Sequence, residues 1–360
     1  MVPDHADPPG RLIVTSVSLA NFRSYARLEL PLEPGLVLAV GPNGAGKTNL
    51  LEALHVGTQG FSPRTRSDSE LIRFGESAAR IRLEGWRGPT AVRLGVSLSA
   101  VEGKRAEVNG ARLRAAEQLR GESATLVFTP DRLAIVKSGP AARRAYFDRS
   151  LARLFPARSS LPADYAAALA QRNAALKRGD VDSIAPWTEQ VARLGAELVA
   201  ARGETLELLV GPFAERADEL GLGSASLSYE GEPPTVSALE DRLARDLERG
   251  ATGLGPHLHD VSIAAGTRDL RAFGSQGEQR TAVLALLLAE AELIGERREE
   301  APLLLLDDVL SELDPERRRV LVEQLSGRGQ TLVTSTTADA MPGEPAQLLE
   351  VSPGEVRWSE

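Results

Sequence analysis

The stretch Gly41-Pro42-Asn43-Gly44-Ala45-Gly46-Lys47-Thr48 has the spacing G-x-x-x-x-G-K-[ST] of a phosphate-binding loop, or P-loop. It follows an apolar run at 36–40 that predicts a buried strand, and it precedes residues 49–54, which predict the start of a helix. Glycines let the backbone turn successive N–H groups inward, and a helix N-terminus adds partial positive charge. We therefore interpret this stretch, together with Asn49, as a nucleotide-binding loop. A glycine-rich turn with an exposed lysine is the alternative.

Two side chains of this loop have predictable roles. The Lys47 ammonium should reach the β- and γ-phosphates of a nucleotide, which makes Lys47 a candidate for catalysis as well as for binding. The Thr48 hydroxyl should ligate Mg²⁺. The loop therefore predicts ATP and Mg²⁺ as cofactors.

A second motif supplies two carboxylates. The apolar run at 303–306 predicts a strand, and Asp307 and Asp308 follow it directly. Ligands of open α/β sheets bind at the carboxyl ends of the strands, so both acids should lie at the ligand-binding edge. Asp307 should hold the Mg²⁺ shell, and Asp308 should orient or deprotonate the attacking water. An acidic turn or a helix cap after a strand is the alternative.

Composition excludes several classes of function. The chain has no cysteine, which excludes disulfides, thiolate metal sites and cysteine nucleophiles. The net charge of −8 means that nucleic-acid binding would need local basic patches. No run approaches the length of a membrane span, and the first ten residues lack the apolar core of a signal peptide. We expect a soluble, cytoplasmic protein that does not contact a membrane.

The order of predicted elements indicates an α/β protein with an insertion. Alternating residues between about 80 and 115 predict a small antiparallel sheet with a hairpin turn at Asn109-Gly110. Residues 126–255 have mostly helical patterns. From 256 to 360 the α/β pattern returns, with a helix at 281–294, strands at 303–306 and 331–334, and a helix at 317–325. We therefore divide the chain at 125 and 255, with the ATPase part on both sides of a helical lobe.

The helical lobe does not predict a long coiled coil. Apolar residues recur at helical spacing from Trp187 to Phe213, and a further short helix is predicted from 235 to 247. Two prolines and two glycines, however, are expected to interrupt the first of these patterns: Pro186, Gly195, Gly211 and Pro212.

A serine motif opens the predicted helix at 281. Ser275, Gly277 and Gln279 form S-x-G-x-Q, and Glu278 stands three residues after Ser275. That spacing is typical of a helix N-cap with a capping box. A serine and a glycine at a helix N-terminus also form an anion site. Both interpretations remain open, and they are compatible. A further motif, Ser311-x-Leu313-Asp314, follows the acid pair.

In this order, P-loop, S-x-G-x-Q, apolar-Asp-Asp and S-x-L-D resemble an ABC-type ATPase. Asn21-Phe22-Arg23 resembles the head domains of the SMC and Rad50 group. Further motifs from about residue 12 to 337 narrow the resemblance to the RecF family of bacterial DNA-repair proteins. These are Pro130-Asp131, Gly139-Pro140, Arg143-Arg144, Phe147-Asp148, Leu169 with Gln171-Arg172-Asn173, Gly255-Pro256-His257, and Ser275-Gln276-Gly277 with Gln279-Arg280.

The resemblance implies a fold and a composite site. The fold is an α/β, ABC-type P-loop ATPase similar to Rad50 and SMC heads, with a β-subdomain and an inserted, mostly helical lobe but no long coiled coil. ATP would lie between two copies, where Ser275, Gly277 and Gln279 of one would complete the site of the other, with Ser275 taking part in catalysis. Arg23 resembles an arginine that approaches the nucleotide phosphates, and a surface arginine on a turn is its alternative.

The resemblance also implies a function. Members of this family are weak, DNA-stimulated ATPases of recombinational repair and replication maintenance. An ATP-dependent homodimer would clamp double-stranded DNA near junctions with single-stranded gaps, and slow hydrolysis would release it. Aid to RecA loading, with RecR and RecO as partners, is implied as well. An ABC transporter ATPase subunit and a nucleotide-gated protein scaffold are the alternatives, and DNA-stimulated ATPase activity would discriminate against the first.

Four arginines are candidates for DNA contact: Arg64, Arg66, Arg143 and Arg144. For the last two, a solvated helix face paired with Asp148 is the alternative. The chain departs from the family pattern at two places. Leu258 stands where the family usually has an arginine, and we align Thr336 with the histidine that senses the γ-phosphate in many ABC ATPases.

Overall fold

The computed structural model describes residues 12–327 and 329–358, and these divide into two compact units. Unit 1 holds the described residues up to Arg132 and again from Ile294, and unit 2 holds Leu133–Leu293. This division differs from the partition at 125 and 255, because it assigns the Ser275 segment to unit 2 and not to the C-terminal part of the ATPase.

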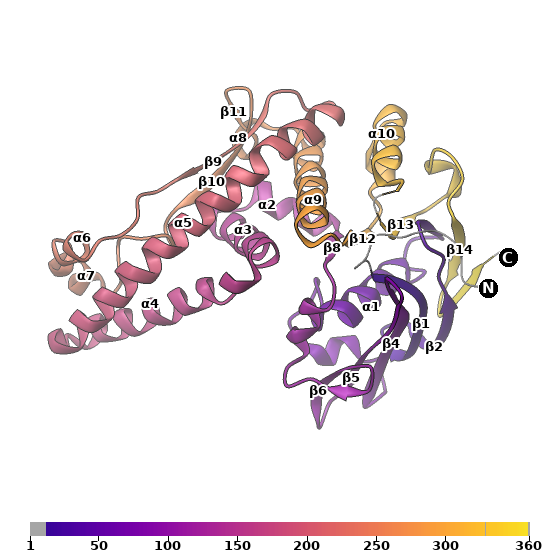
Figure 1. Cartoon of the computed structure of the whole chain (residues 1–360), viewed down its shortest axis with the longest axis horizontal. Helices are drawn as coiled ribbons and strands as arrows, with labels where there is room; N and C mark the ends of the chain where they lie inside the picture. The colour runs from indigo at the N-terminus through magenta and orange to yellow at the C-terminus, as the bar shows by residue number, and fades with distance from the viewer. Residues whose placement is uncertain (1–11, 328, 359–360) are drawn as a thin grey trace. The chain divides into compact units, whose positions relative to one another are not determined.

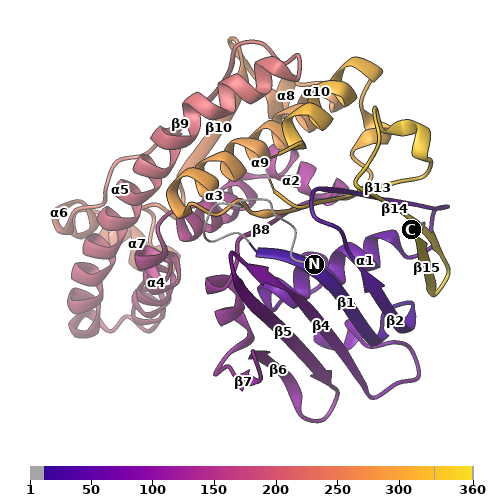
Figure 2. The ribbon, with the colours of Figure 1, turned by 45° about the vertical axis from the view of Figure 1, so that its right-hand side comes forward.

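The first sheet of unit 1 is antiparallel and has six strands in the order β2-β1-β4-β5-β6-β7 (Figure 2). The strands are β1 (Leu12–Phe22), β2 (Tyr25–Pro31), β4 (Ala78–Arg87), β5 (Thr90–Ser99), β6 (Gly103–Val108) and β7 (Ala111–Arg112). Asn109 and Gly110 have positive φ angles of 51° and 83° between β6 and β7, so the predicted hairpin turn is confirmed. The predicted small sheet is larger than expected, because β1 and β2 belong to it.

The second sheet of unit 1 has the order β15-β14-β3-β13-β12-β8, and all neighbours except β14 and β15 are parallel. The strands are β3 (Leu36–Val40), β8 (Thr125–Phe128), β12 (Leu303–Leu306), β13 (Thr331–Ser335), β14 (Gln347–Ser352) and β15 (Glu355–Trp358). The strands predicted at 36–40, 303–306 and 331–334 are neighbours here. Their carboxyl ends therefore meet at one edge of the sheet.

Helix α1 (Lys47–Gln59) lies between the two sheets of unit 1 (Figure 2). Almost all of its residues are buried, as expected for a helix covered on opposite faces. Gly57 permits a close approach to the first sheet, because a Cβ atom there would lie 2.6 Å from Cδ1 of Leu83. Helix α10 (Pro315–Leu325) also belongs to this unit, as does the end of α9 (Gln276–Arg298) from Ile294 onward.

Unit 2 is mostly helical. Its helices are α2 (Ala134–Lys137), α3 (Pro140–Leu154), α4 (Leu161–Arg178), α5 (Val181–Glu219), α6 (Val236–Glu240), α7 (Leu243–Arg249), α8 (Leu270–Phe273) and most of α9 (Gln276–Arg298). The helix predicted from 235 to 247 is two short helices, α6 and α7. None of the helices described is long and apolar enough to cross a membrane.

Helix α5 corrects one expectation. It runs unbroken for 39 residues through Pro186 and Pro212, which we expected to interrupt it. Packing overrides the local preference, since α5 lies beside α4 over its first part (Figure 1) and also packs against α3 and β9 (Ala225–Glu230). Gly195 is a point of close contact in this helix, because a Cβ there would lie 2.5 Å from Cγ of Pro234. The result is a helical hairpin, and a long coiled coil is absent from the described residues, as predicted.

A three-stranded sheet in unit 2 was not predicted. It has the order β11-β10-β9 and consists of β9 (Ala225–Glu230), β10 (Asp260–Ala265) and β11 (Arg268–Asp269). Ala225 and Leu227 are buried and alternate with exposed residues, which is the signal of a half-buried strand. The region was therefore less uniformly helical than its composition indicated.

Candidate nucleotide-binding site

The P-loop links β3 to α1 and has a backbone that requires glycine. Gly44 and Gly46 have φ angles of 81° and 115°, in the left-handed region. A Cβ on Gly46 would also lie 3.0 Å from the side-chain oxygens of Ser24 and Tyr25. The Tyr25 hydroxyl donates a hydrogen bond of 3.0 Å to the Gly46 carbonyl. The loop is therefore held from β2, at the point where α1 begins.

Lys47 lies folded over the loop. Its ammonium donates hydrogen bonds to the carbonyls of Gly41, at 2.6 Å, and Pro42, at 3.0 Å. Burial lowers the pKa of this ammonium, while the nearby carboxylates of Asp308 and Asp307 oppose that shift. An ammonium has three donors, so one N–H remains for an anion in the loop.

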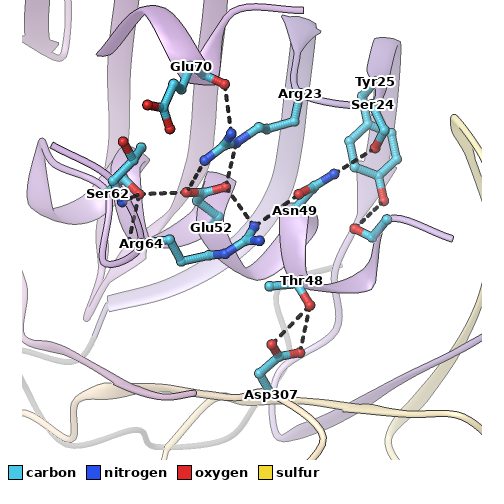
Figure 3. A network of polar contacts seen from close by, with 12 residues as sticks. Arg23, Ser24, Tyr25, Thr48, Asn49, Glu52, Ser62, Arg64, Glu70 and Asp307 are labelled. Carbon is cyan, nitrogen blue, oxygen red and sulfur yellow. Dashed lines mark hydrogen bonds and ion pairs between the residues drawn. The ribbon is translucent and has the colours of Figure 1, made fainter. Parts of the chain in front are cut away.

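Thr48 and Asp307 meet as the sequence motifs predict (Figure 3). The Thr48 hydroxyl lies 3.0 Å and 2.9 Å from the two Asp307 carboxylate oxygens, although the residues are 259 positions apart. The α1 N-terminus positions the hydroxyl, and the carboxyl end of β12 positions the carboxylate. Oxygen ligands of this kind, beside a phosphate-binding loop, fit a Mg²⁺ ion.

Asp308 has two unusual features. Its φ angle is 52°, which is rare for a residue other than glycine and is a kind of strain found at functional sites. Its Oδ1 atom is buried and has no hydrogen-bond partner among the described residues. Buried carboxylate oxygens normally have partners, so this atom fits a position that awaits a water or a ligand.

Thr334 connects the two acids and was missed by the sequence analysis. Its hydroxyl donates to Asp307 Oδ1 at 2.8 Å and accepts from the Asp308 backbone N–H at 2.9 Å. Thr334 is fully buried in β13, the strand between β3 and β12. Thr336, the residue aligned with the sensor histidine, is exposed two positions later. The role of Thr334 could not be predicted because it depends on the register of β13 beside β12.

We expect Thr334→Val to weaken Mg²⁺-dependent activity. Valine keeps the shape but removes one of the two hydroxyl donors to Asp307 and leaves the Asp308 N–H without its acceptor, which should destabilise the fold by about 1–3 kcal/mol. Residues that orient a metal ligand typically contribute 10- to 100-fold to metal affinity or activity. The measurement is ATPase rate against Mg²⁺ concentration, beside thermal unfolding. Thr336→Val is the matched control, and equal Mg²⁺ dependence of the two variants would show that the Thr334 hydroxyl does not orient Asp307.

One buried carboxylate on α1 gathers two arginines (Figure 3). Glu52 is 1% exposed and receives both the Nε and Nη2 atoms of Arg23, at 2.8 Å and 2.9 Å. Arg64 Nη1 lies 3.3 Å both from Glu52 and from the Asn49 side-chain oxygen. Ser62 donates a fourth hydrogen bond to Glu52, at 2.5 Å.

This network contains Arg23, predicted to approach the nucleotide, and Arg64, a candidate for DNA contact. Arg23 has a φ angle of 50° and also donates to the Glu70 carbonyl, so it is a fixed part of the structure and not a freely solvated arginine. Arg64 donates a hydrogen bond to the side chain of Asn49, directly after the P-loop, and both Arg64 and Arg66 are exposed. Glu52 itself was missed, because its role depends on segments far apart in the sequence.

The Ser275 motif forms a reciprocal cap in unit 2. The Ser275 N–H donates to the Glu278 carboxylate at 2.8 Å, and the Glu278 N–H donates to the Ser275 hydroxyl at 3.2 Å. These contacts and Arg268 lower the pKa of Glu278. Ser275 and Gly277 are exposed at the start of α9. Gln279, a predicted nucleotide contact, is instead buried and donates to the Leu270 carbonyl at 2.8 Å.

The comparisons with known proteins agree with this geometry. The family model described as the RecF/RecN/SMC N terminal domain matches residues 13–355. A DNA replication and repair protein RecF from Heliobacterium modesticaldum is 35% identical, over 93% of this chain and 95% of that protein. A RecF from Streptomyces avermitilis is also 35% identical, over 92% and 95% of the two chains. The chain belongs to the RecF family.

Solved structures extend the comparison. A structure of the recombination mediator protein RecF with ATP, in the RecFOR pathway, has a TM-score of 0.86 at 28% identity and covers 99% of this chain and all of that one. An Smc head domain derived from Pyrococcus furiosus has a TM-score of 0.60 at 18% identity, which supports the fold alone. The ABC-type head fold is thus confirmed. Membership in the RecF family over nearly the whole chain also removes the transporter ATPase alternative.

The two arginines of α3 that were candidates for DNA contact, Arg143 and Arg144, make contacts within unit 2 instead. Arg143 is 4% exposed and makes a two-point ion pair with Asp260, at 2.7 Å and 2.6 Å. Arg144 is half-buried and donates to the His259 carbonyl at 2.7 Å. Asp148 pairs with Arg202 instead. The geometry favours a structural role for Arg143 and does not support a DNA contact by it.

The departure at residue 258 leaves an apolar side chain on the surface. Leu258 is 57% exposed, where the RecF family usually has an arginine. The neighbouring His257 accepts from or donates to the Tyr165 hydroxyl at 2.7 Å, and burial lowers the pKa of its imidazole. Leu258 therefore contributes no charge to this part of unit 2.

Proposed function

We propose that the chain is an ATP-dependent DNA-binding ATPase of recombinational repair and replication maintenance. The observation that carries the proposal is the joined arrangement of P-loop, Thr48, Asp307 and Asp308, with an unpartnered Asp308 oxygen at its edge. Two related structures, described as RecF-ATPrS at 27% identity and RecF-ATP at 28% identity, support the choice of nucleotide.

Different residues of unit 1 have different roles in the proposed hydrolysis of ATP. Thr48 and Asp307 would hold Mg²⁺, which neutralises charge on the phosphates when bound. The loop N–H groups and the Lys47 ammonium bind and orient the triphosphate. Asp308 accepts the proton of the attacking water, and the hydrogen bond between its backbone and Thr334 fixes its place. With no histidine at the end of β13 to sense the γ-phosphate, turnover should be slow.

The active form we propose is a homodimer assembled by ATP. Ser275 and Gly277 are exposed at the N-terminus of a long helix, which suits them to bind the terminal phosphate held by a second copy. Two-fold symmetry then gives two composite sites. The dimer clamps double-stranded DNA near junctions with single-stranded gaps, DNA stimulates its weak ATPase, and hydrolysis releases it. RecR and RecO are the proposed partners in loading RecA, in the cytoplasm.

DNA affinity with and without ATP, measured across salt concentrations, tests this proposal. A dimer that contacts about 6 phosphates should give a slope near −5 for log affinity against log salt. Without ATP, both affinity and slope should be much smaller, because the clamp is not assembled. A slope near zero with saturating ATP would contradict DNA clamping and would favour a nucleotide-gated protein scaffold.

A further inference from the structure

The outer face of the six-stranded sheet carries a row of residues aligned by strand register. Arg27 on β2 pairs with Ala20 on β1, which pairs in turn with Arg80 on β4. Arg80 pairs with Ser97 on β5, and Ser97 pairs with Arg105 on β6. Residues directly opposite one another on neighbouring strands point to the same face. We call these five residues the arginine row.

The arginine row lies on the solvent side of the sheet. All three arginines are exposed. The residues one position away on each strand are buried on the opposite face, toward α1: Leu28, Leu19, Ile81, Val96 and Ala106. Ala20 and Ser97 have small side chains, so the arginine side chains can project beyond the surface between them. Figure 2 shows the five strands side by side, from β2 to β6. The row therefore crosses most of the width of the sheet.

The next rung of the ladder places Glu29 and Glu107 on the same face, level with Arg82, but within the described part of the chain most arginines of this surface have no direct acidic partner. Among the described residues Arg27 and Arg80 have no acidic partner, and neither has Arg82, two positions after Arg80 on the same face. Arg105 pairs with Glu102 at 3.0 Å, but both side chains are about half exposed, so the pair contributes little. Exposed like charges on neighbouring positions repel. In a chain with a net charge of −8, this concentration of arginine fits an anionic partner.

The spacing of the row fits a nucleic-acid backbone. Neighbouring strands lie about 4.8 Å apart, so arginines on every second strand are about 10 Å apart. That distance is about the axial rise of three nucleotides in one DNA strand. Arginine binds phosphate through two parallel hydrogen bonds, and a serine hydroxyl such as that of Ser97 donates to phosphate as well.

We propose that the arginine row, with Arg82 beside it, binds the phosphate backbone of double-stranded DNA. The proposal rests on the DNA-binding function proposed above and assigns part of that function to a surface of unit 1. None of the row residues is aromatic, and the exposed Trp86 on this face lies six positions along β4 from Arg80, so the row itself offers no stacking for unpaired bases. Duplex is therefore the expected form of DNA.

The test is a triple variant, Arg27→Gln, Arg80→Gln and Arg105→Gln, in the full-length protein with saturating ATP and Mg²⁺. The control is Arg158→Gln, Arg193→Gln and Arg319→Gln, which removes the same charge from exposed arginines on helical segments that pair with Glu204, Glu197 and Glu323. Each phosphate contact contributes about one unit to the salt slope. We expect the slope for duplex DNA to flatten by about 3 for each copy whose row contacts the duplex, and to stay at the wild-type value in the control. ATP binding should be unchanged in both.

The outcomes separate the two proposals. If wild-type protein shows no ATP-dependent, salt-dependent DNA binding, the proposed function itself fails. If wild-type protein binds DNA and the row variant keeps the wild-type slope, the row does not contact DNA, and an acidic protein segment becomes its candidate partner. An equal loss in the row and control variants would mean that net charge, and not this surface, sets the affinity, which also overturns the inference. Thermal unfolding of both variants confirms that the comparison is made on folded protein.

Discussion

Replacing Asp308 with asparagine is expected to reduce ATP hydrolysis by at least about 100-fold while ATP binding persists. Asparagine is nearly the same size but cannot accept a proton, and general base catalysis typically contributes 10²–10⁴-fold. The Thr48–Asp307 pair does not involve the Asp308 side chain, so the proposed Mg²⁺ ligands stay in place. The backbone contact from Asp308 to Thr334 is also retained. The measurement is single-turnover hydrolysis beside equilibrium ATP binding.

The same variant should accumulate the ATP-bound dimer and its DNA complex, because the proposed clamp is released by hydrolysis. Asp308→Ala is a useful second variant, since it removes the side chain whose Oδ1 atom has no partner. Wild-type turnover by Asp308→Asn would assign water activation to another residue. Loss of ATP binding would instead make Asp308 a metal ligand.

Replacing Ser275 with arginine is expected to abolish hydrolysis and tight DNA binding without abolishing ATP binding. A bulky cation at the start of α9 would occupy the place where we propose that two copies close on the nucleotide. The P-loop and Asp307 are untouched by this change. Ser275→Ala is the control for the cap alone. It removes the hydrogen bond to the Glu278 N–H, at a cost of about 1 kcal/mol of helix stability, without adding bulk.

Mixing Ser275→Arg with Lys47→Met sharpens this result. Each variant should be inactive alone. In the mixed dimer, one composite site carries both changes and the other carries neither. Recovery of ATPase activity on mixing is therefore expected if one intact site is sufficient. Activity of Ser275→Arg alone would contradict a site shared between copies.

Much of the nucleotide site could be predicted from local sequence. The glycines of the P-loop, the strand before it and the helix after it are adjacent in the chain, so one pattern contains them. The meeting of Thr48 and Asp307 spans 259 positions, yet it follows from a general rule about the carboxyl ends of parallel strands. Where a rule of this kind connects distant segments, the sequence is sufficient.

Thr334 and Glu52 could not be found in this way. The role of Thr334 depends on the register of β13 beside β12, which the sequence does not specify to one residue. Glu52 looks like an ordinary helix residue until the segments that carry Arg23 and Arg64 are folded against it. Both residues act through tertiary contacts and have no local pattern.

The positions of the arginines also depend on tertiary contacts that the local sequence does not show. Arg143 has helical spacing compatible with a surface stripe, but β10 supplies Asp260 and buries it. Arg27, Arg80 and Arg105 are scattered in sequence and form a row because of antiparallel register. Helix α5 likewise depends on packing, which overrides its prolines.

The central claim is that ATP joins two copies through Ser275. Light scattering or sedimentation of Ser275→Arg beside wild-type protein, with saturating ATP and Mg²⁺, tests it most directly. The account predicts a wild-type dimer that dissociates when ATP is withdrawn, and a Ser275→Arg protein that binds ATP but stays monomeric. A Ser275→Arg protein that dimerises with ATP as the wild type does would contradict the account and leave Ser275 as a helix cap only.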